Sequence, residues 1–143
     1  MVEFGNATHV EAWGMNSNWG LGDPCLNLWW GIICDANGSI TEIRLLSNGL
    51  RGAIPASIEY LSSLTTIKLS SNHLYGTLPS SLQRMSALRW IDLSFNDYES
   101  IQLAPPPNLE TLLLAWNPLR QLTMTRVPVN LGTLCVHTCW ICD

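Results

Sequence analysis

Three cysteines close to the end of the sequence have a spacing that occurs in metal sites. Cys135, Cys139 and Cys142 follow the pattern Cys-x3-Cys-x2-Cys, and cysteine thiolates hold iron–sulfur clusters. That chemistry needs a large barrel around the cluster with the motif near its start, whereas only Asp143 follows Cys142. A zinc site needs four ligands, and the one histidine nearby, His137, would lie on the same strand as Cys135 and Cys139. We therefore expect no metal site and interpret this segment as a C-terminal cap.

The cysteines also bear on disulfide pairing. The chain has five of them, so at least one thiol is free or pairs with another chain. For the C-terminal segment we favour a Cys135–Cys142 disulfide with Cys139 buried, and the spacing alone leaves the other pairings open.

The remaining residue types that carry catalysis form no pattern. The three histidines, His9, His73 and His137, fall in unrelated segments, and we interpret them as surface or turn residues. The sequence has no nucleophile elbow, no phosphate-binding loop and no pair of carboxylates at a fixed spacing. It predicts a protein that is not an enzyme and that needs no cofactor.

The composition excludes several other classes of protein. Of the 143 residues, 13% are charged and 47% are hydrophobic, which favours one folded domain over a disordered chain. The net charge is −4 and Lys68 is the one lysine, so no cluster of cations is present to bind nucleic acid. No apolar run approaches the roughly 18 residues needed to span a bilayer. Residues 1–13 lack the pattern of a signal peptide, so we expect a processed or shortened chain, or one that is never secreted.

Apolar residues recur along the chain with a period of 21 to 24 residues. Five segments align when they begin at Ile40, Leu64, Leu88, Leu109 and Leu131. In each segment the first, fourth and sixth positions are apolar. The ninth positions are Asn48, Asn72, Asn96, Asn117 and Cys139. This is the pattern L-x-x-L-x-L-x-x-N/C-x-L.

The spacing predicts a solenoid. The fourth and sixth positions are two residues apart, so on a short strand they share one face and point inward. One turn cannot bury that face alone, whereas stacked turns form a parallel sheet over a continuous core. The ninth residue turns the chain out of the strand, and its side chain can bond backbone groups of that bend, repeat after repeat. We expect an α/β fold, a right-handed solenoid of about five repeats with a concave parallel sheet.

The first two repeats carry a more specific motif. Residues 48–55 and 72–79 both follow Asn-x-Leu-x-Gly-x-Ile/Leu-Pro, in which Gly52 and Gly76 suit a bend at positive φ. These repeats resemble the plant-type leucine-rich repeat family, whose consensus is L-x-x-L-x-L-x-x-N-x-L-x-G-x-I-P. The later repeats depart from it, with residues 97–107 in the third and Asn117-Pro118 in the fourth. We expect the convex side of that half to be irregular.

The segment before the repeats resembles the N-terminal cap of the same family. Gly-Asp-Pro-Cys at 22–25 is followed by Trp-Gly-Ile-Ile-Cys at 30–34. The resemblance implies a Cys25–Cys34 disulfide, a tryptophan packed over the first turn, and a helix of which residues 2–13 are a remnant. We therefore divide the chain into a cap at 1–39, repeats one to four and the start of the fifth at 40–134, and a last repeat with a cysteine-rich C-terminal cap at 131–143.

The outward positions of each strand differ between repeats. The third positions are Glu42, Thr66, Trp90, Thr111 and Thr133; the fifth are Arg44, Lys68, Asp92, Leu113 and Cys135; the eighth are Ser47, Ser71, Phe95, Trp116 and Thr138. These columns predict a candidate binding site that consists of Trp90, Asp92, Phe95, Leu113 and Trp116, with Arg44 and Lys68 beside it. Exposed aromatic side chains flanked by cations are typical of binding hot spots. The alternative is that Phe95 and Trp116 fold over the edge of the asparagine ladder and pack on the next turn.

Two functions from different classes fit these observations. In the first, the chain is a recognition module of a receptor ectodomain or secreted repeat protein and binds a peptide or protein partner through the concave face, as the resemblance implies. In the second, it is a structural subunit held permanently in a larger assembly, which the low surface charge would suit. The Cys25–Cys34 pair implies an oxidising, extracellular or luminal compartment. Glycosylation sequons at Asn6 and Asn37 fit secretion.

Overall fold

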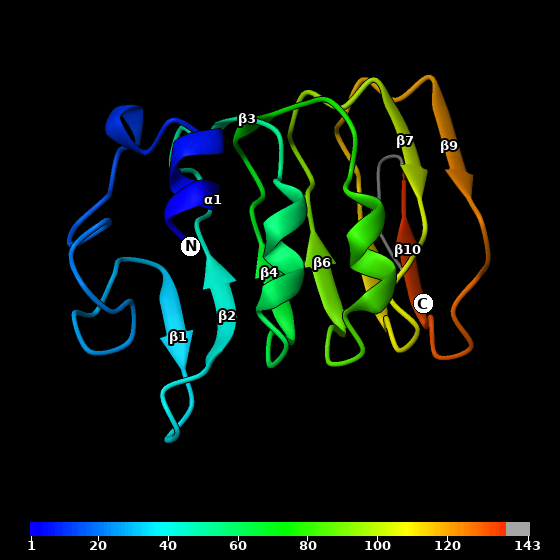
Figure 1. Ribbon diagram of the computed structural model, residues 1–143. Helices are drawn as coiled ribbons and strands as arrows, with labels where there is room; N and C mark the ends of the chain where they lie inside the picture. The colour runs from blue at the N-terminus through cyan, green and yellow to red at the C-terminus, as the bar shows by residue number, and fades with distance from the viewer. Residues whose placement is uncertain (137–143) are drawn as a thin grey trace.

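Five short parallel strands, one from each repeat, lie side by side in the computed structural model, which describes residues 1–136. They belong to a six-stranded main sheet, whose order is β1 (Ile32–Cys34), β2 (Ile40–Arg44), β4 (Thr66–Lys68), β6 (Trp90–Asp92), β8 (Thr111–Leu113) and β10 (Thr133–Cys135). β1 pairs with β2 in the antiparallel sense, and all other pairs are parallel. The chain therefore forms the solenoid of about five repeats that the sequence predicts (Figure 1).

The register of the main sheet matches the repeat alignment residue by residue. One row of facing residues runs through Glu42, Thr66, Trp90, Thr111 and Thr133, and the next row runs through Arg44, Lys68, Asp92, Leu113 and Cys135. The fourth and sixth positions point the other way. Ile43, Leu45, Ile67 and Leu69 are at most 1% exposed. The core is thus a continuous apolar layer behind the sheet.

Two short 3₁₀ helices cover the core on the side away from the main sheet. η2 (Ala56–Tyr60) and η3 (Ser80–Arg84) each begin directly after a proline, Pro55 or Pro79. Proline has no N–H to lose at a helix start and fixes a suitable φ. Ile58 and Leu82 point inward and are buried, so each helix closes one turn of the solenoid.

Two further pairs of parallel strands line a lateral face. β3 (Arg51–Gly52) pairs with β5 (His73–Leu74), and β7 (Ser100–Leu103) pairs with β9 (Gln121–Met124). As expected, the convex side of the second half is irregular, since no helix corresponding to η2 or η3 follows β6 within the described residues. The lateral strands of that half are instead more regular, because β7 and β9 pair over four residues and β3 and β5 over only two. β7 forms a regular strand because exposed and buried residues alternate along it. Ile101 and Leu103 are buried whereas Ser100 and Gln102 are exposed, which is the two-residue period of a strand.

Gly52 and Gly76 have the backbone conformation that their motif predicts. Their φ angles are +120° and +85°, a region that side chains strongly disfavour. At Gly52 a Cβ atom would also lie 2.2 Å from the carbonyl oxygen of Ala7. The first glycine therefore lets the N-terminal segment lie directly against the first repeat.

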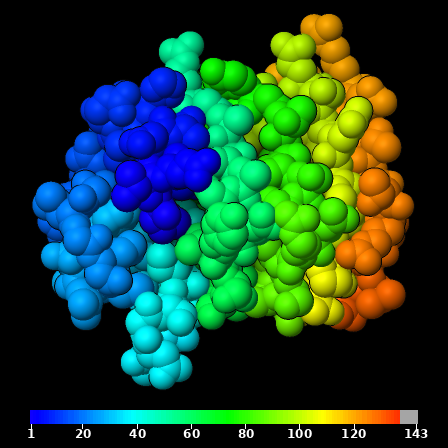
Figure 2. All heavy atoms as spheres, viewed as in Figure 1, coloured from blue at the N-terminus to red at the C-terminus, as the bar shows by residue number. Residues whose placement is uncertain are grey.

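Aromatic side chains build the cap at the N-terminal end. The helix α1 (Val2–Ala7) and the 3₁₀ turn η1 (Val10–Ala12) bring Phe4 and Trp13 together, with ring centroids 6.3 Å apart. Trp19 lies 4.6 Å from Trp13 and 5.0 Å from Trp29. Figure 2 shows this segment, in blue, lying against the first repeats. The cap buries the open end of the core, as the edge of a solenoid requires.

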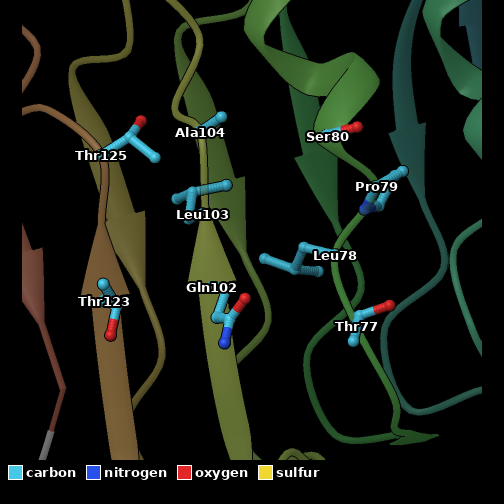
Figure 3. A pocket seen from close by; sticks show the side chains of 9 residues that line it. All are labelled: Thr77, Leu78, Pro79, Ser80, Gln102, Leu103, Ala104, Thr123 and Thr125. Carbon is cyan, nitrogen blue, oxygen red and sulfur yellow. The ribbon is translucent and has the colours of Figure 1, made fainter.

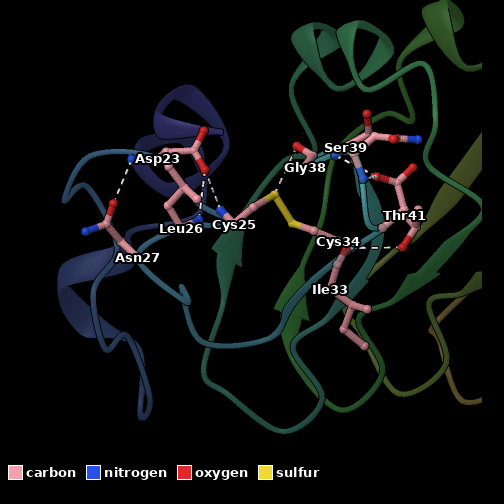
Figure 4. Close-up of a disulfide and its surroundings, with 11 residues drawn as sticks. Asp23, Cys25, Leu26, Asn27, Ile33, Cys34, Gly38, Ser39 and Thr41 are labelled. Carbon is pink, nitrogen blue, oxygen red and sulfur yellow. Dashed lines mark hydrogen bonds between the residues drawn. A yellow bond between two sulfur atoms is a disulfide. The ribbon is translucent and has the colours of Figure 1, made fainter.

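The Cys25–Cys34 disulfide is present, as the resemblance implied, with the two Cα atoms 5.8 Å apart (Figure 4). It ties the cap to β1, which in turn covers the edge of β2. Asp23 accepts hydrogen bonds from the N–H groups of Cys25 and Leu26 at 2.8 and 2.9 Å, fixing the turn that carries the first cysteine. The first repeat strand therefore does not leave its edge exposed at this end.

At the other end, Cys135 is buried and is disulfide-bonded. The predictions for Cys139 and Cys142, and for His137 and Thr138, fall outside the described residues, so the proposed Cys135–Cys142 pairing stays a prediction. No helix within residues 1–136 has the length and apolar character needed to cross a bilayer.

Candidate functional site

The ninth-position asparagines fix the shape of the turns that follow β2, β4, β6 and β8. Asn72 is buried, and its side-chain oxygen accepts from the N–H groups of Asn48 and Leu50, both at 3.0 Å. Its amide donates to the carbonyls of Leu45 and Leu69 at 2.8 and 2.9 Å. Each side chain therefore joins its own repeat to the one before it.

The same arrangement runs along the described part of the ladder. Asn96 donates to Leu69 and Leu93, and Asn117 donates to Leu93 and Leu114, at 2.9 to 3.1 Å. The amide of Asn48 donates to Met15, so the ladder extends into the cap. The bonds of Asn96 are buried and those of Asn48 and Asn117 are partly buried, so the ladder defines each turn.

The ladder imposes an unusual backbone on the residue just before each asparagine. The φ angles at these eighth positions lie between +49° and +59°. The residues are Ser47, Ser71, Phe95 and Trp116. A positive φ is unfavourable for any residue with a side chain, and more so for a bulky one. In the second half, two large aromatic side chains thus occupy positions where the backbone is strained.

Phe95 and Trp116 stack on each other at these turns. Their ring centroids are 5.4 Å apart and their planes differ by 12°. The residues nevertheless remain 51% and 55% exposed. They pair with each other and leave about half of their surface in solvent. The arrangement is a preformed aromatic platform at the rim of the main sheet.

Trp90 forms a second apolar group, on the exposed face of β6. It is 38% exposed, and Nζ of Lys68 on the neighbouring strand lies 5.2 Å from the centre of its ring. This is a cation–π contact, which stabilises an exposed pair by about 0.5–1 kcal/mol. The contact positions a positive charge beside an exposed ring.

The other candidate residues lie in the row next to Trp90. Asp92 and Leu113 face each other across β6 and β8, and the Asp92 carboxylate accepts from the N–H of Ser94 at 3.0 Å. Arg44 faces Lys68, but its guanidinium bonds Glu42 on its own strand at 2.7 Å. Its charge is therefore already paired.

The structure thus separates the candidate site into a Trp90–Lys68 group and a Phe95–Trp116 group, with Asp92 between them along β6. No ring contact within residues 1–136 joins the two groups. The same residues contain no group of three or more metal-ligating side chains. The surface offers apolar area, a cation and a carboxylate, which suits binding rather than bond-making chemistry.

Sequence reasoning did not single out Tyr98. It occupies the eleventh position, where the first two repeats have Leu50 and Leu74, and it is fully buried. Its hydroxyl has no hydrogen-bond partner among the described residues, and burial raises the pKa of that hydroxyl well above its usual value. The sequence could have indicated this residue, because it is a tyrosine at a repeat position that otherwise holds leucine.

Comparison with known proteins supports the repeat assignment. A family model described as "Leucine rich repeat" matches residues 38–98 and 62–119, together more than half of the chain. Curated protein sequences contain no match to the chain.

Several solved structures share the fold. The structure of PEPR1 with AtPEP1 is 21% identical, with a TM-score of 0.60 over 90% of this chain and 26% of that one. Pollen Receptor Kinase 3 is 26% identical, with a TM-score of 0.58 over 78% of this chain and 61% of that one. The complex of BIR3 with SERK2 from Arabidopsis thaliana is 23% identical, with a TM-score of 0.60 over 90% of this chain and 84% of that one. This chain spans about a quarter of the first of these proteins and about three fifths of the second.

Proposed function

Because the chain belongs to the leucine-rich repeat family, we propose that it is a recognition module that binds a peptide or protein through the exposed face of its main sheet. Solenoids of this kind act by presenting an extended surface. The proposal has the support of fold relatives whose structures contain a second component, AtPEP1 with PEPR1 and SERK2 with BIR3.

The observation that carries the proposal is the pair of half-exposed rings at strained turns. Phe95 and Trp116 adopt positive φ angles where Ser47 and Ser71 hold the same place in the first half. A small residue would meet the structural requirement of the ladder at lower cost. Large aromatic residues in exposed positions are enriched in binding hot spots. We infer that the two rings serve a partner, with Trp90 and Lys68 extending the contact.

The experiment is a selection of a random twelve-residue peptide library on the whole chain. Enriched peptides are then titrated against the chain and against a triple variant, Trp90→Thr, Phe95→Ser and Trp116→Ser, which carries the residues of the first half. We expect the Kd to rise at least tenfold in the variant. The matched control is Tyr60→Ser, an aromatic residue that is 81% exposed on η2, and it should leave binding unchanged. Equal binding by all three proteins, or no enrichment, would contradict the proposal.

In this proposal residues 1–39 are the cap, residues 40–134 are the repeats and residues 131–143 close the solenoid. We place the module outside the cell or in a lumen, in line with its disulfide. Asn6 and Asn37 are both exposed, which leaves them accessible to a glycosylation enzyme. The mass of the natively isolated chain should fall after glycosidase treatment. An unglycosylated chain that copurifies in a fixed complex would instead favour the structural subunit.

A further inference from the structure

A groove runs along the lateral face between residues 75–80 and β7 (Figure 3). Its larger part has a volume of about 480 Å³. Thr77 and Leu78 line one side, Gln102 and Leu103 of β7 lie in the middle, and Thr123 and Thr125 line the side toward β9. A second hollow of about 440 Å³ is lined by Gly76 and Thr77 and, at its acidic end, by Glu99. Both volumes fall in the range of about 300–1,000 Å³ that is usual for ligand sites.

The groove exists because the two lateral strand pairs separate. β5 pairs with β3, and β7 pairs with β9. One backbone hydrogen bond, from the N–H of Asp97 to the carbonyl of Leu74 at 2.9 Å, connects β5 to the chain that leads into β7. Beyond that bond, Gly76 turns its chain at a φ of +85°. No strand within the described residues fills the space that opens there.

Within residues 1–136, no backbone hydrogen bond reaches the edge of β7 that faces the groove. The carbonyls of Glu99 and Leu103 accept from the N–H groups of Arg120 and Thr125, on the β9 side, at 2.7 and 3.0 Å. Backbone groups alternate in direction along a strand. Ser100 and Gln102 therefore direct their N–H and carbonyl groups toward the groove. Such an edge is a template for another strand.

The side chains of the groove define which strand would fit. Leu78 and Leu103 are 5% and 1% exposed and form an apolar floor, whereas Thr77 and Gln102 are exposed, polar and uncharged. One end is acidic. Asp97 pairs with His73 at 3.3 Å, and Glu99, which is exposed, has no ion pair among the described residues.

We propose that this groove binds an extended peptide segment of a partner protein, which adds a strand to the open edge of β7. Strand addition takes its affinity from main-chain hydrogen bonds and its specificity from alternate side chains. The segment carries apolar residues toward Leu78 and Leu103, polar residues toward solvent, and a cation at the end next to Glu99. The groove lies on the lateral face and is separate from Trp90 and the Phe95–Trp116 platform.

The test uses backbone amide NMR of the whole chain with the synthetic peptide Lys-Thr-Val-Thr-Val, which has a free amino terminus and an amidated carboxyl terminus. At millimolar peptide, we expect shifts of the Ser100 and Gln102 amides and of Thr77. The same peptide with N-methyl groups on its second and fourth residues cannot donate those hydrogen bonds and should lose the shifts. A peptide that begins with Glu, or the Glu99→Gln variant, should bind at least threefold more weakly.

Two variants separate the groove from a change in folding. Thr77→Trp should fill the groove and weaken peptide binding at least fivefold, whereas Gln83→Trp, on the exposed side of η3 and outside the groove, should not. The proposal is overturned if Ser100 and Gln102 do not shift, if the N-methylated peptide shifts them equally, or if they shift with protein concentration alone. The last outcome would mean that a second copy of the chain occupies the edge.

Discussion

The first two repeats and the two that follow them share an interior and differ on their surfaces. In both halves the fourth and sixth positions are buried aliphatic residues, and an asparagine joins each turn to the one before it. Outside, the first half has Ser47 and Ser71 at the strained turns, whereas the second has Phe95 and Trp116. The lateral strands pair over two residues in the first half and over four in the second.

This difference shows which positions the fold constrains and which positions it leaves free to vary. The ladder requires a left-handed residue at each eighth position but does not require that residue to be large. Replacing a serine by a tryptophan at such a position adds strain and exposed apolar surface, neither of which helps folding. The second half therefore carries features that the fold alone does not explain. This is why we propose its surface as the place where a partner binds.

The largest expected effect comes from breaking the shared interior. Asn72→Ala removes a buried side chain that bonds two N–H groups and the carbonyls of Leu45 and Leu69. Leaving those groups unpaired should lower the free energy of unfolding by about 3–5 kcal/mol. Asn117→Ala, at a half-buried position with fewer bonds, should cost about 2 kcal/mol. Urea unfolding of both variants checks this, and equal losses would show that the ladder is uniform between the halves.

The next effect concerns the cap that closes the first half. Replacing both Cys25 and Cys34 by alanine removes the disulfide and should cost about 2–3 kcal/mol, because the unfolded chain regains the freedom of that loop. Thermal unfolding measures the loss. Because reduction also opens the disulfide of Cys135, the wild-type chain and the double variant are compared both oxidised and reduced, and the two should melt at about the same temperature only when both are reduced. An unchanged melting temperature would mean that the aromatic cluster holds the cap without the disulfide.

A smaller effect on stability and a clear effect on binding are expected at the platform. Phe95→Ser with Trp116→Ser gives the second half the residues of the first. Both side chains are about half exposed, so the free energy of unfolding should change by less than about 0.5 kcal/mol. Peptide affinity should fall at least tenfold, which is about 1.4 kcal/mol. Calorimetric titration and urea unfolding on the same samples separate the two quantities. A large loss of stability with unchanged binding would assign the rings to the fold.

The smallest effect should be a gain. Tyr98→Phe removes a buried hydroxyl that has no partner among residues 1–136, and the free energy of unfolding should rise by about 1 kcal/mol. Burial also raises the pKa of this hydroxyl in the folded state. The folded chain keeps its proton where the unfolded chain releases it, so stability is present below about pH 10 and falls as the pH rises further. The advantage of the variant should grow above that pH. Tyr75→Phe, at an exposed tyrosine, should show neither effect.

Much of the fold could be predicted from the sequence because the apolar positions of each repeat are the positions that the fold buries. The columns that begin at Glu42 and Arg44 reappear as facing residues of the main sheet. The four-residue pair of β7 and β9 was missed because residues 97–107 were compared with the family consensus, and not read for the alternation of Ser100, Ile101, Gln102 and Leu103. The groove could not be predicted from the sequence either. It depends on two strand pairs separating in space, which no single repeat encodes.

The candidate site was predictable as columns and not as contacts. The alignment gathered Trp90, Phe95 and Trp116 on one surface, but it could not show that Phe95 stacks on Trp116 while Trp90 pairs with Lys68. It also placed Arg44 beside the site, but it could not show that the Arg44 guanidinium pairs with the carboxylate of Glu42, two residues earlier on the same strand. Such pairings depend on side-chain conformations and on the positive φ that the ladder imposes.

Amide hydrogen exchange, with and without a library-selected peptide, tests the central claim most directly. If the exposed face of the second half is the binding surface, bound peptide should slow exchange in β6, in β8 and at the turns that carry Phe95 and Trp116. The strands of the first half, apart from the Lys68 side of β4, should exchange as before. Slowed exchange confined to β2 and the cap, or to residues 75–80 and β7, would contradict the claim.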